Sequence, residues 1–517
     1  MNRARVFPAL LAFVLIAQAC AQAPSTSTPS GAAKTLDRVT LASPTDFPSL
    51  DPSYRTSVAV AHALINIYDT LVTFDKDLKL APGLATSWKS VDPTVWEFTL
   101  RTGVTFSDGE AFNAGSVKAW FTRLQEIRDK ALGASSIQLI PSVTDVTAVN
   151  DTTVRFTTSQ ADPTLPGRLA TYFTSITPAG PFKAGDTKAL MAAPVGTGPY
   201  MVKENVAGDH LTLVPNPKYW GTAPAAREIV YRIIKDAAAR AAALRSSQAD
   251  VAFDLPIAEL AGIGGDKNLT VLAKPEATRV YWFLLASAAE GPLASKQVRQ
   301  ALNYAVDRKT IIDKLLAGHA QETSSLVSRQ AFGYCDVPAY TYDVAKAKQL
   351  LAEGGFPNGF TLDVSYSPGN TTAEEQVVQA VGSYLADVGI KLNYLQKDLL
   401  PRIADLSAKK TKGLFYLGQT SPLPDADYIF GEFQPTGIAG WTQPLTGQSQ
   451  TLYLQERKEL NLETRAKLAC DIQKLQRDEA PVLYLWQLDL INGANTAKLT
   501  WDMSSDGIFR ASRVTPK

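Results

Sequence analysis

Two aspartates and two prolines stand close together in the segment Thr420–Tyr428, TSPLPDADY. Paired carboxylates such as Asp425 and Asp427 are the residue types that general acid–base catalysis uses. Carboxylates in a turn more often cap the chain or face water, and their spacing alone raises no pKa. The composition of the segment predicts a turn rather than a helix or a strand, and its function depends on what that turn contacts.

The rest of the chain offers these aspartates no catalytic partner. The three histidines, His62, His210 and His319, are far apart and form no His-Glu-x-x-His motif, so each is expected at the surface or in the core. Gly-x-Ser-x-Gly and Walker motifs are absent, and GTGPY (196–200) begins like a dinucleotide-binding loop but has Met201 at the third glycine position. The sequence predicts no enzyme, no catalytic residue, no cofactor and no metal site.

Hydrophobic periodicity indicates the elements that must position the turn. Alternating apolar residues predict strands in VWEFTLR (95–101), IVYRII (229–234) and FTLDVSY (360–366). Apolar residues on one helical face predict a helix over 298–318 that ends at Gly318.

The second half of the chain alternates strands with helices. Asp343 is a predicted N-cap of a helix that ends at Gly354 and Gly355. From Phe360 the chain then reads strand, helix, strand, helix and strand, and the last strand, GLFYLG, precedes the turn. Two successive β-α-β crossovers are right-handed and build a mainly parallel sheet, whose ligands bind at the carboxyl ends of the strands. The turn is therefore predicted to be a binding loop.

Length and charge set wider limits. A chain of 517 residues suggests two or three domains, and its formal net charge is +1. Without residues 1–19, which include Arg3 and Arg5, the balance is slightly acidic. A near-neutral chain offers no basic stripe for phosphates, so nucleic acid is not an expected partner.

The N-terminus predicts export. Basic residues precede the apolar run VFPALLAFVLIA, which is of signal-peptide length and shorter than a membrane-spanning helix. Cleavage before Cys20 with lipid attachment to its thiol is one interpretation, although Ala17 stands where a lipobox usually has leucine; ordinary cleavage after Ala19 or Ala21 is the other. Residues 20–37 are a predicted flexible tether. The protein is expected in the periplasm or on the outer face of the cytoplasmic membrane.

Two cysteines remain in the body of the chain, Cys335 and Cys470. Export permits a disulfide between them, but their distance in sequence says nothing about their distance in space. A disulfide and two separate buried thiols are both compatible with the sequence.

The region Pro82–Leu124 resembles the signature of the extracellular solute-binding proteins of family 5, the peptide- and nickel-type receptors of ABC importers. The resemblance rests on LATSW, LRTGVTFSDGEAF, VGTGPYMV, NPKYWG, VRQALNYAVDR, YDVAKAKQLLAEGGF and APVLYLW, which occur in the family's order and cover nearly the whole mature chain.

This resemblance implies an α/β fold of two lobes that close about a hinge around a ligand. Lobe I is expected at 38–277 with a return at 488–517, and lobe II at 278–487. An extra subdomain of lobe I is expected at about 55–185. The implied partners are a small-molecule or peptide ligand and a membrane complex of ABC permease and ATPase, and a monomer is expected.

The resemblance also suggests ligand-binding residues. Peptide-binding members often carry an aspartate after the strand that precedes the turn, and this aspartate pairs with the ligand's amino group; here Pro422 stands at that position, without charge or N–H. Asp425 matches a later acidic position that is usually structural, and a shift of register by three would bring it to the ligand. The candidate ligand-binding residues are Tyr281, Trp282, Ser421, Asp425, Trp441, Tyr484 and Trp486. Alternation along the strand predicts that Tyr484 and Trp486 share one face, and a core role is the alternative for each aromatic residue.

The predicted function is a substrate-binding receptor for a short peptide or peptide-like molecule. Pro422 leaves open a non-peptide polar metabolite, sugar-derived or opine-like. Nickel is not favoured, because Ala170–Gly180 lacks the arginine that the nickel-type receptors imply. An exported hydrolase would need a nucleophile with a base, and an adhesin or chaperone-like protein with the same fold is a further alternative.

Overall fold

The computed structural model describes most of the chain after the predicted tether. Residues 35–517 form one compact unit. The predicted signal peptide 1–19, Cys20 and Trp441 lie outside the described residues. The described residues are 34–54, 60–131, 135–179, 193–276, 278–286, 291–368, 373–434, 437, 440, 442, 443 and 445–517.

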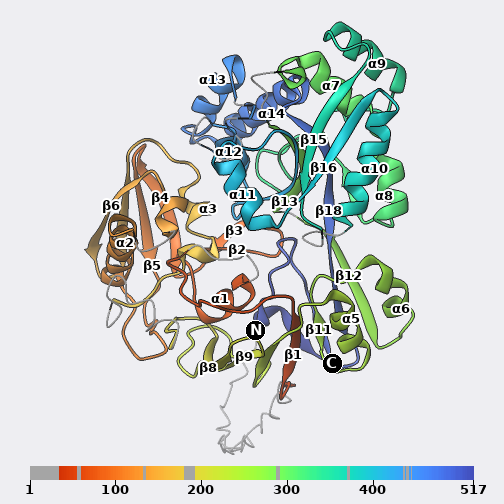
Figure 1. The fold of residues 1–517 in the computed structure, drawn as a ribbon. Coiled ribbons are helices and arrows are strands. Elements are labelled where there is room, and N and C mark those ends of the chain that lie inside the picture. The colour runs from red at the N-terminus through yellow and green to blue at the C-terminus, as the bar shows by residue number, and fades with distance from the viewer. Residues whose placement is uncertain are drawn as a thin grey trace, which may run out of the picture. The chain divides into compact units, whose positions relative to one another are not determined.

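A twelve-stranded mixed sheet is the largest element of the structure (Figure 1). Its strand order is β16-β15-β17-β13-β18-β11-β1-β10-β9-β8, with β12 and β14 also paired to β18. The strands are β1 (Val39–Ser43), β8 (Tyr200–Val206), β9 (His210–Pro215), β10 (Ile229–Ile233), β11 (Val251–Ala252), β12 (Leu269–Pro275), β13 (Arg279–Ala286), β14 (Ala320–Glu322), β15 (Phe360–Tyr366), β16 (Ile390–Gln396), β17 (Gly413–Thr420) and β18 (Val482–Asn495).

Strand β18 belongs to both halves of this sheet. Its residues up to Leu488 pair with β13 and β14, and from Asp489 onward it pairs with β12 and then β11. Figure 1 shows it as one long strand that runs from the β13–β17 half to the β11–β12 half. The change of partner lies close to the predicted lobe boundary at 487/488, and the boundaries themselves stay a prediction.

Smaller sheets complete the strand inventory. Strands β4, β5, β7 and β6 form an antiparallel sheet in that order. Its core joins Phe98 and Phe156 to Trp120 of the helix beside it. The bounds are β2 (Val72–Phe74), β3 (Leu80–Pro82), β4 (Ala85–Asp92), β5 (Val95–Leu100), β6 (Val143–Asn150), β7 (Thr153–Thr158), β19 (Leu499–Trp501) and β20 (Val514–Pro516).

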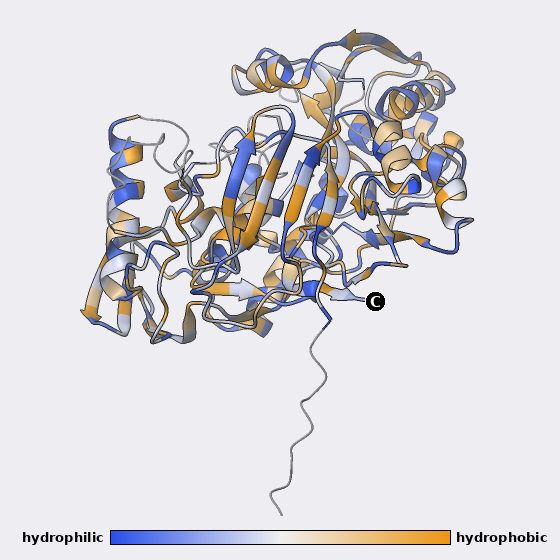
Figure 2. Cartoon of the chain, turned by 90° about the horizontal axis from the view of Figure 1, so that it is seen from below, coloured by the Kyte–Doolittle hydropathy of each residue, from blue (hydrophilic) through white to orange (hydrophobic). Residues whose placement is uncertain are grey.

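The helices are mostly amphipathic. Figure 2 shows hydrophobic and hydrophilic residues along most helices and strands, as expected of elements with one buried face. The helices are α1 (Ala61–Ile67), α2 (Ala114–Asp129), α3 (Leu165–Arg168), α5 (Ala237–Arg245), α6 (Leu260–Gly264), α7 (Lys296–Tyr304), α8 (Arg308–Leu315), α9 (Val344–Glu353), α10 (Glu374–Ala386), α11 (Leu399–Ser407), α12 (Ala426–Glu432), α13 (Gly447–Glu456) and α14 (Leu462–Glu479).

The two predicted crossovers are confirmed, but the mainly parallel sheet predicted with them is wrong, because most neighbouring strands of the large sheet pair antiparallel. Strand β15 pairs in parallel with β16 and β17, and α10 and α11 are the intervening helices. The predicted strands are β5, β10 and β15. Asp343 is the N-cap of α9, because its side chain accepts a hydrogen bond from Lys346 N.

The single helix predicted over 298–318 is wrong, because the structure has two helices there, α7 and α8. The Asp307 side chain accepts from Thr310 N and so begins a new helix. Arg308 turns inward and donates to the carbonyls of Asn303 and Tyr484, at 3.0 and 2.6 Å. The apolar face continues through the break, which is why periodicity did not reveal it. Helix α8 ends at Leu315 with Leu316 as its C-cap, so Gly318, the predicted end, lies two residues beyond the cap, with φ of 81°.

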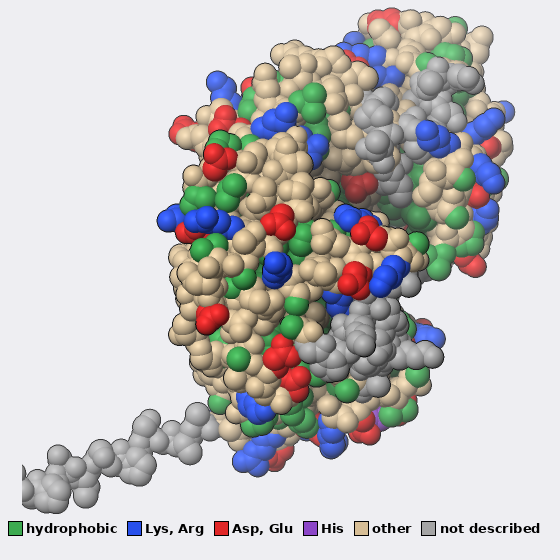
Figure 3. Space-filling model, turned by 90° about the vertical axis from the view of Figure 1, so that its left-hand side faces the viewer, with side chains coloured by type: hydrophobic (Ala, Val, Ile, Leu, Met, Phe, Trp, Pro, Cys, Tyr) green, Lys and Arg blue, Asp and Glu red, His purple; other side chains and the backbone are tan. Residues whose placement is uncertain are grey.

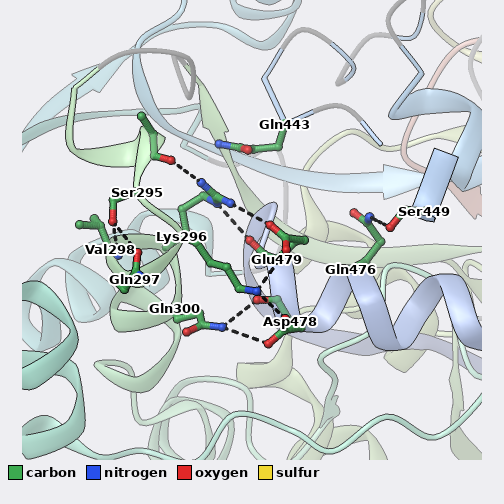
Figure 4. Close-up of polar contacts among 12 residues, drawn as sticks. Ser295, Lys296, Gln297, Val298, Gln300, Gln443, Ser449, Gln476, Asp478 and Glu479 are labelled. Carbon is green, nitrogen blue, oxygen red and sulfur yellow. Dashed lines mark hydrogen bonds and ion pairs between the residues drawn. The ribbon is translucent and has the colours of Figure 1, made fainter. Parts of the chain in front are cut away.

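The N-terminus of α7 is tied to the C-terminus of α14 (Figure 4). Lys296 forms ion pairs with Asp478 and Glu479, and Gln300 Nε2 donates to Asp478 O at 2.8 Å. These groups are largely exposed, so each pair adds little stability; together they orient one helix end on the other.

Cys335 and Cys470 form a disulfide, with Cα atoms 5.3 Å apart. The bond connects the loop before α9 to α14, across 135 residues of sequence. It resolves the alternative that the sequence left open, because the two cysteines meet only through the tertiary fold.

The surface described by the structure carries mixed charge. Figure 3 shows acidic and basic side chains interspersed on one face. Among the described residues, no helix combines the length and apolar character needed to cross a bilayer, and no three potential metal-ligating His, Cys, Asp or Glu side chains cluster.

Reduction of the disulfide should lower the free energy of unfolding. Closing a loop of this length restricts the unfolded chain, so Cys470→Ser is expected to cost about 2–4 kcal/mol. Guanidinium unfolding of the wild type with and without reductant, and of the variant, measures this cost. An unchanged midpoint under reducing conditions would contradict the prediction.

Candidate functional site

The turn after β17 lines a hollow that encloses about 480 Å³ of space, part of it open to solvent. Part of its wall comes from early parts of the chain, including Ile65, Phe74 and Tyr172. Another part is the turn itself, with Ser421 and Pro422. The wall therefore joins segments that the sequence assigned to different lobes. We call this space the first hollow.

Backbone contacts hold the turn in place. Ser421 N donates to Thr278 O at 2.6 Å, and Ser421 Oγ donates to Leu423 O. Pro422 presents an apolar ring to the first hollow and offers no N–H. The wall has no carboxylate at the position where the resemblance placed one.

The end of the predicted turn is helical, which corrects the sequence-based assignment. Asp425 is the N-cap of α12, because its carboxylate accepts from Asp427 N at 3.0 Å. The same carboxylate binds the Arg465 guanidinium through two hydrogen bonds, with Nη1–Oδ2 at 2.8 Å. With Ser421, it also lines a smaller hollow of about 240 Å³ behind the turn. Its ligand-binding role stays a prediction.

Arg465 also forms an ion pair with a second carboxylate, that of Glu456. Glu456 Oε1 lies 2.7 Å from Arg465 Nη2, and both side chains are buried. Because Asp425 already occupies this guanidinium, one positive charge is shared by two carboxylates. Burial raises the pKa of Glu456 well above its usual value, and the Arg465 charge offsets this only in part. The folded protein therefore holds a proton on Glu456 to a higher pH than the unfolded chain does.

Asp427 reaches across the turn to α3. Its Oδ2 forms a buried ion pair with Arg168 Nη2, and Arg168 also donates to Leu139 O at 3.1 Å. Burial disfavours the charge on Arg168, but Asp427 and the nearby Asp162 and Asp425 raise the pKa of the guanidinium overall. Asp427 Oδ1 is buried without a hydrogen bond to any described residue. The pair fixes α12 against a segment almost 260 residues earlier in the chain.

The four described aromatic candidates are buried in the sheet. Tyr281, Trp282, Tyr484 and Trp486 are each at most 2% exposed. The indole N–H groups of Trp282 and Trp486 have no acceptor among the described residues. None of the four is in the wall of a described hollow, so the fold places them in the core and their contact with a ligand stays a prediction.

The prediction that Tyr484 and Trp486 share one face is wrong. Trp282 pairs with Tyr484, but Tyr281 pairs with Trp486, so β18 contains one extra residue at this point. Tyr484 packs with Trp282, whereas Trp486 packs with Tyr281 in a different cluster. A β-bulge breaks strict alternation and turns the two rings to opposite sides of the sheet.

A second hollow, of about 740 Å³, adjoins the first and shares Ile65, Phe74 and Arg510 with it. Asp69 is in its wall, and its Oδ2 accepts from Trp220 Nε1 at 2.8 Å and from Thr197 Oγ1 at 2.9 Å.

Thr197 belongs to GTGPY, and the structure explains this motif. A Cβ on Gly196 would lie 2.1 Å from Ile67 O, and one on Gly198 would lie 2.6 Å from Ile67 C. The glycines let the chain pass the end of α1, and no nucleotide is needed to explain them.

The C-terminal segment supplies charges that the sequence did not lead us to expect. Asp506 and Arg510 form an ion pair at 2.7 Å and line the first hollow. Burial opposes ionisation of Asp506, but Arg510 and the Ser504 hydroxyl hold the pKa of its carboxyl below its usual value. The spacing of four residues between Asp506 and Arg510 could have indicated this pair from the sequence. Arg168 was not predicted either, because it lies two residues before the stretch in which the resemblance implies an arginine.

The chain belongs to the bacterial extracellular solute-binding proteins, family 5, whose family model matches residues 79–440. The glutathione-binding protein GsiB of Escherichia coli strain K12 is 31% identical over 398 residues, which are 75% of this chain and 76% of that protein.

Solved structures show the same fold, that of the two-lobed periplasmic binding proteins. DppA of Helicobacter pylori, in complex with the peptide STSA, matches with a TM-score of 0.79 and 23% identity over 93% of this chain and 98% of DppA. AgaA of A. tumefacien R10, in complex with agropinic acid, matches with a TM-score of 0.77 and 23% identity over 93% of this chain and 99% of AgaA.

The Arg168–Asp427 pair should behave as a coupled unit. Arg168→Met or Asp427→Asn leaves one buried group uncompensated, and each is expected to lower the free energy of unfolding by about 3–5 kcal/mol. The double variant Arg168→Met with Asp427→Asn removes both charges and should cost less than the sum of the two single variants. Urea unfolding of the variants measures the coupling; additive losses would show that the two groups act independently.

Glu456 should make stability depend on pH. The folded protein holds a proton that the unfolded chain releases above the ordinary glutamate pKa of 4.5, so unfolding releases a proton and stability falls as pH rises. Above that pH the expected slope is about 1.4 kcal/mol per pH unit until folded Glu456 itself ionises. Glu456→Gln should abolish this component and gain stability relative to wild type at higher pH. The exposed Glu463→Gln in α14 is the control; equal pH profiles for wild type and Glu456→Gln would refute the assignment.

Proposed function

We propose that this protein is the substrate-binding receptor of an ABC importer. It captures a short peptide or peptide-like molecule between its lobes and delivers it to the membrane permease. The observation that carries the proposal is the first hollow, where the turn 420–424 faces Ile65, Phe74 and Tyr172 from the other end of the chain. A ligand in this space contacts both sides and so favours the closed arrangement. Family membership and the binding of glutathione and a peptide by GsiB and DppA support the class of cargo.

The buried charges support binding rather than catalysis. Asp425 and Asp427, the paired carboxylates of the turn, are each committed to an arginine. The wall of the first hollow can therefore hold a ligand, and we assign it no reaction.

The receptor is expected to be exported and to act as a monomer that meets permease and ATPase at the membrane. Family membership supports export. We further propose that Cys20 carries the lipid anchor and that residues 20–37 tether the folded part to the membrane surface. The disulfide between Cys335 and Cys470 is compatible with an oxidising compartment outside the cytoplasm.

A non-peptide polar metabolite is the second candidate cargo. The observation in its favour is Pro422, which gives the wall an apolar ring in place of a carboxylate for a peptide amine. AgaA, with the same fold and agropinic acid bound, illustrates such a cargo in another protein. We propose that Ser421, and Trp441 on the following loop, contact the ligand in either case.

Native mass spectrometry of the protein purified without added ligand tests the proposal. Co-purified peptides, identified after denaturation, are the expected result. Their N-acetylated forms should bind with nearly the same affinity, because Pro422 offers no partner for the amino group. A single non-peptide mass would replace the peptide class by the metabolite class. An empty protein that no peptide or polar metabolite stabilises in a thermal-shift screen would refute the receptor function.

A further inference from the structure

The second hollow shares part of its wall with the first. Ile65, Phe74 and Arg510 line both hollows, and Arg513 and Ser512 line the second hollow only. A ligand seated against the turn therefore lies next to residues that also line the second hollow. The charges in the wall of the second hollow bear on the chemistry of that ligand.

The Arg513 guanidinium has unused hydrogen-bond donors. Its Nη1 is buried and has no acceptor among the residues that the structure describes. Within the same part of the chain, no carboxylate lies within 4.0 Å of its nitrogens, since it takes part in none of the ion pairs found. The Arg513 side chain is partly exposed, and its buried Nη1 on the wall of the hollow is free to donate to a bound anion.

Arg510 offers a further hydrogen-bond donor beside Arg513. Asp506 neutralises the Arg510 charge through Nη2, but the Nε of Arg510 is buried and has no acceptor among the described residues. Burial lowers the pKa of Arg513 and the charge of Arg510 lowers it further, while Asp506, Asp502 and Asp75 offset this in part. The two guanidinium groups are therefore close enough for one charge to affect the other.

One carboxylate also lines the second hollow. It belongs to Asp69, and its Oδ2 accepts hydrogen bonds from Trp220 and Thr197. A negatively charged group would be repelled by this carboxylate and attracted by Arg513. An anionic group of a ligand should therefore lie at the C-terminal end of the hollow.

We propose that the second hollow is an anion subsite, in which Arg513, assisted by Arg510 Nε, binds a carboxylate of the cargo held in the first hollow. This rests on the proposed receptor function and narrows its cargo to molecules that carry a free carboxylate. Guanidinium and carboxylate match in geometry and form two parallel hydrogen bonds, which a carboxamide cannot reproduce. A peptide's terminal carboxylate and an acidic side chain are the two sources of this group.

The test compares a mixed tripeptide library as free acids and as C-terminal amides, on wild type and on Arg513→Gln, by thermal shift and competition. For wild type, amidation should weaken binding about ten- to a hundredfold, the usual effect of losing a charge-assisted hydrogen bond. Arg513→Gln should lower the affinity for the free acids to that for the amides, and it should leave the affinity for the amides unchanged. If Arg513→Gln weakens the binding only of peptides that contain Asp or Glu, the bound carboxylate is that of a side chain. The proposed subsite would be overturned if wild type binds acids and amides with equal affinity and if Arg513→Gln does not weaken the binding of peptides with acidic side chains.

Controls separate binding from folding. Arg227→Gln removes the same charge from an exposed arginine outside both hollows and should change nothing. The melting temperature of empty Arg513→Gln should equal or exceed that of wild type, because a repulsive charge is removed. If Arg513→Gln does not fold, Arg513→Lys, which keeps the charge but loses the paired geometry, should retain only part of the preference for acids over amides; an undiminished preference would contradict the role of Arg513.

If no peptide binds, the peptide cargo is refuted. A simple anion then still tests the subsite. Succinate, compared with sodium chloride at equal ionic strength, should raise the melting temperature of wild type and of Arg227→Gln but not of Arg513→Gln. The absence of a rise in wild type, or an equal rise in all three, would overturn the subsite independently of the receptor function.

Discussion

Strand β18 is the constraint on which the rest of the structure depends. A buried strand must satisfy its backbone N–H and C=O groups along its whole length, and β18 does so with one set of partners up to Leu488 and another from Asp489. The chain therefore crosses from one half of the sheet to the other within a single hydrogen-bonded strand. The adjacent crossing, at the junction of β12 and β13, runs beside it. The first hollow lies where segments from these two halves and the C-terminal segment meet, whereas the second is lined by residues of the first half of the chain and of the C-terminal segment.

The two aspartates at the end of the turn are both neutralised by buried arginines, and this limits their role. They stand at the start of α12, where one caps the helix and binds Arg465 and the other binds Arg168. Carboxylates buried in this way stabilise the position of the turn, and Pro422 is left to face the first hollow. Selectivity for a ligand then has to come from residues other than these two aspartates. The C-terminal segment places in the second hollow an arginine, Arg513, that forms no ion pair with the described residues.

Periodicity predicted local elements well and their interruptions poorly. The strands β5, β10 and β15, the Asp343 cap and both crossovers follow from alternation, helical spacing and capping chemistry, which act within a few residues. The break between α7 and α8 and the bulge in β18 do not, because in each case buried groups of distant segments decide. Arg308 breaks the helical pattern to donate to Tyr484 O, and an extra residue in β18 places Tyr484 and Trp486 in different clusters.

The sequence by itself determined the class of protein, because ordered family blocks and a signal-like N-terminus are properties of the linear chain. It also predicted that the turn after β17 would be a binding loop, since the topology of parallel crossovers places ligands there. Only the tertiary structure decided which residues face the hollows. Contacts such as Arg168 with Asp427 and Cys335 with Cys470 join residues more than 130 positions apart, and the pairing of charges across such distances depends on packing that no local pattern encodes.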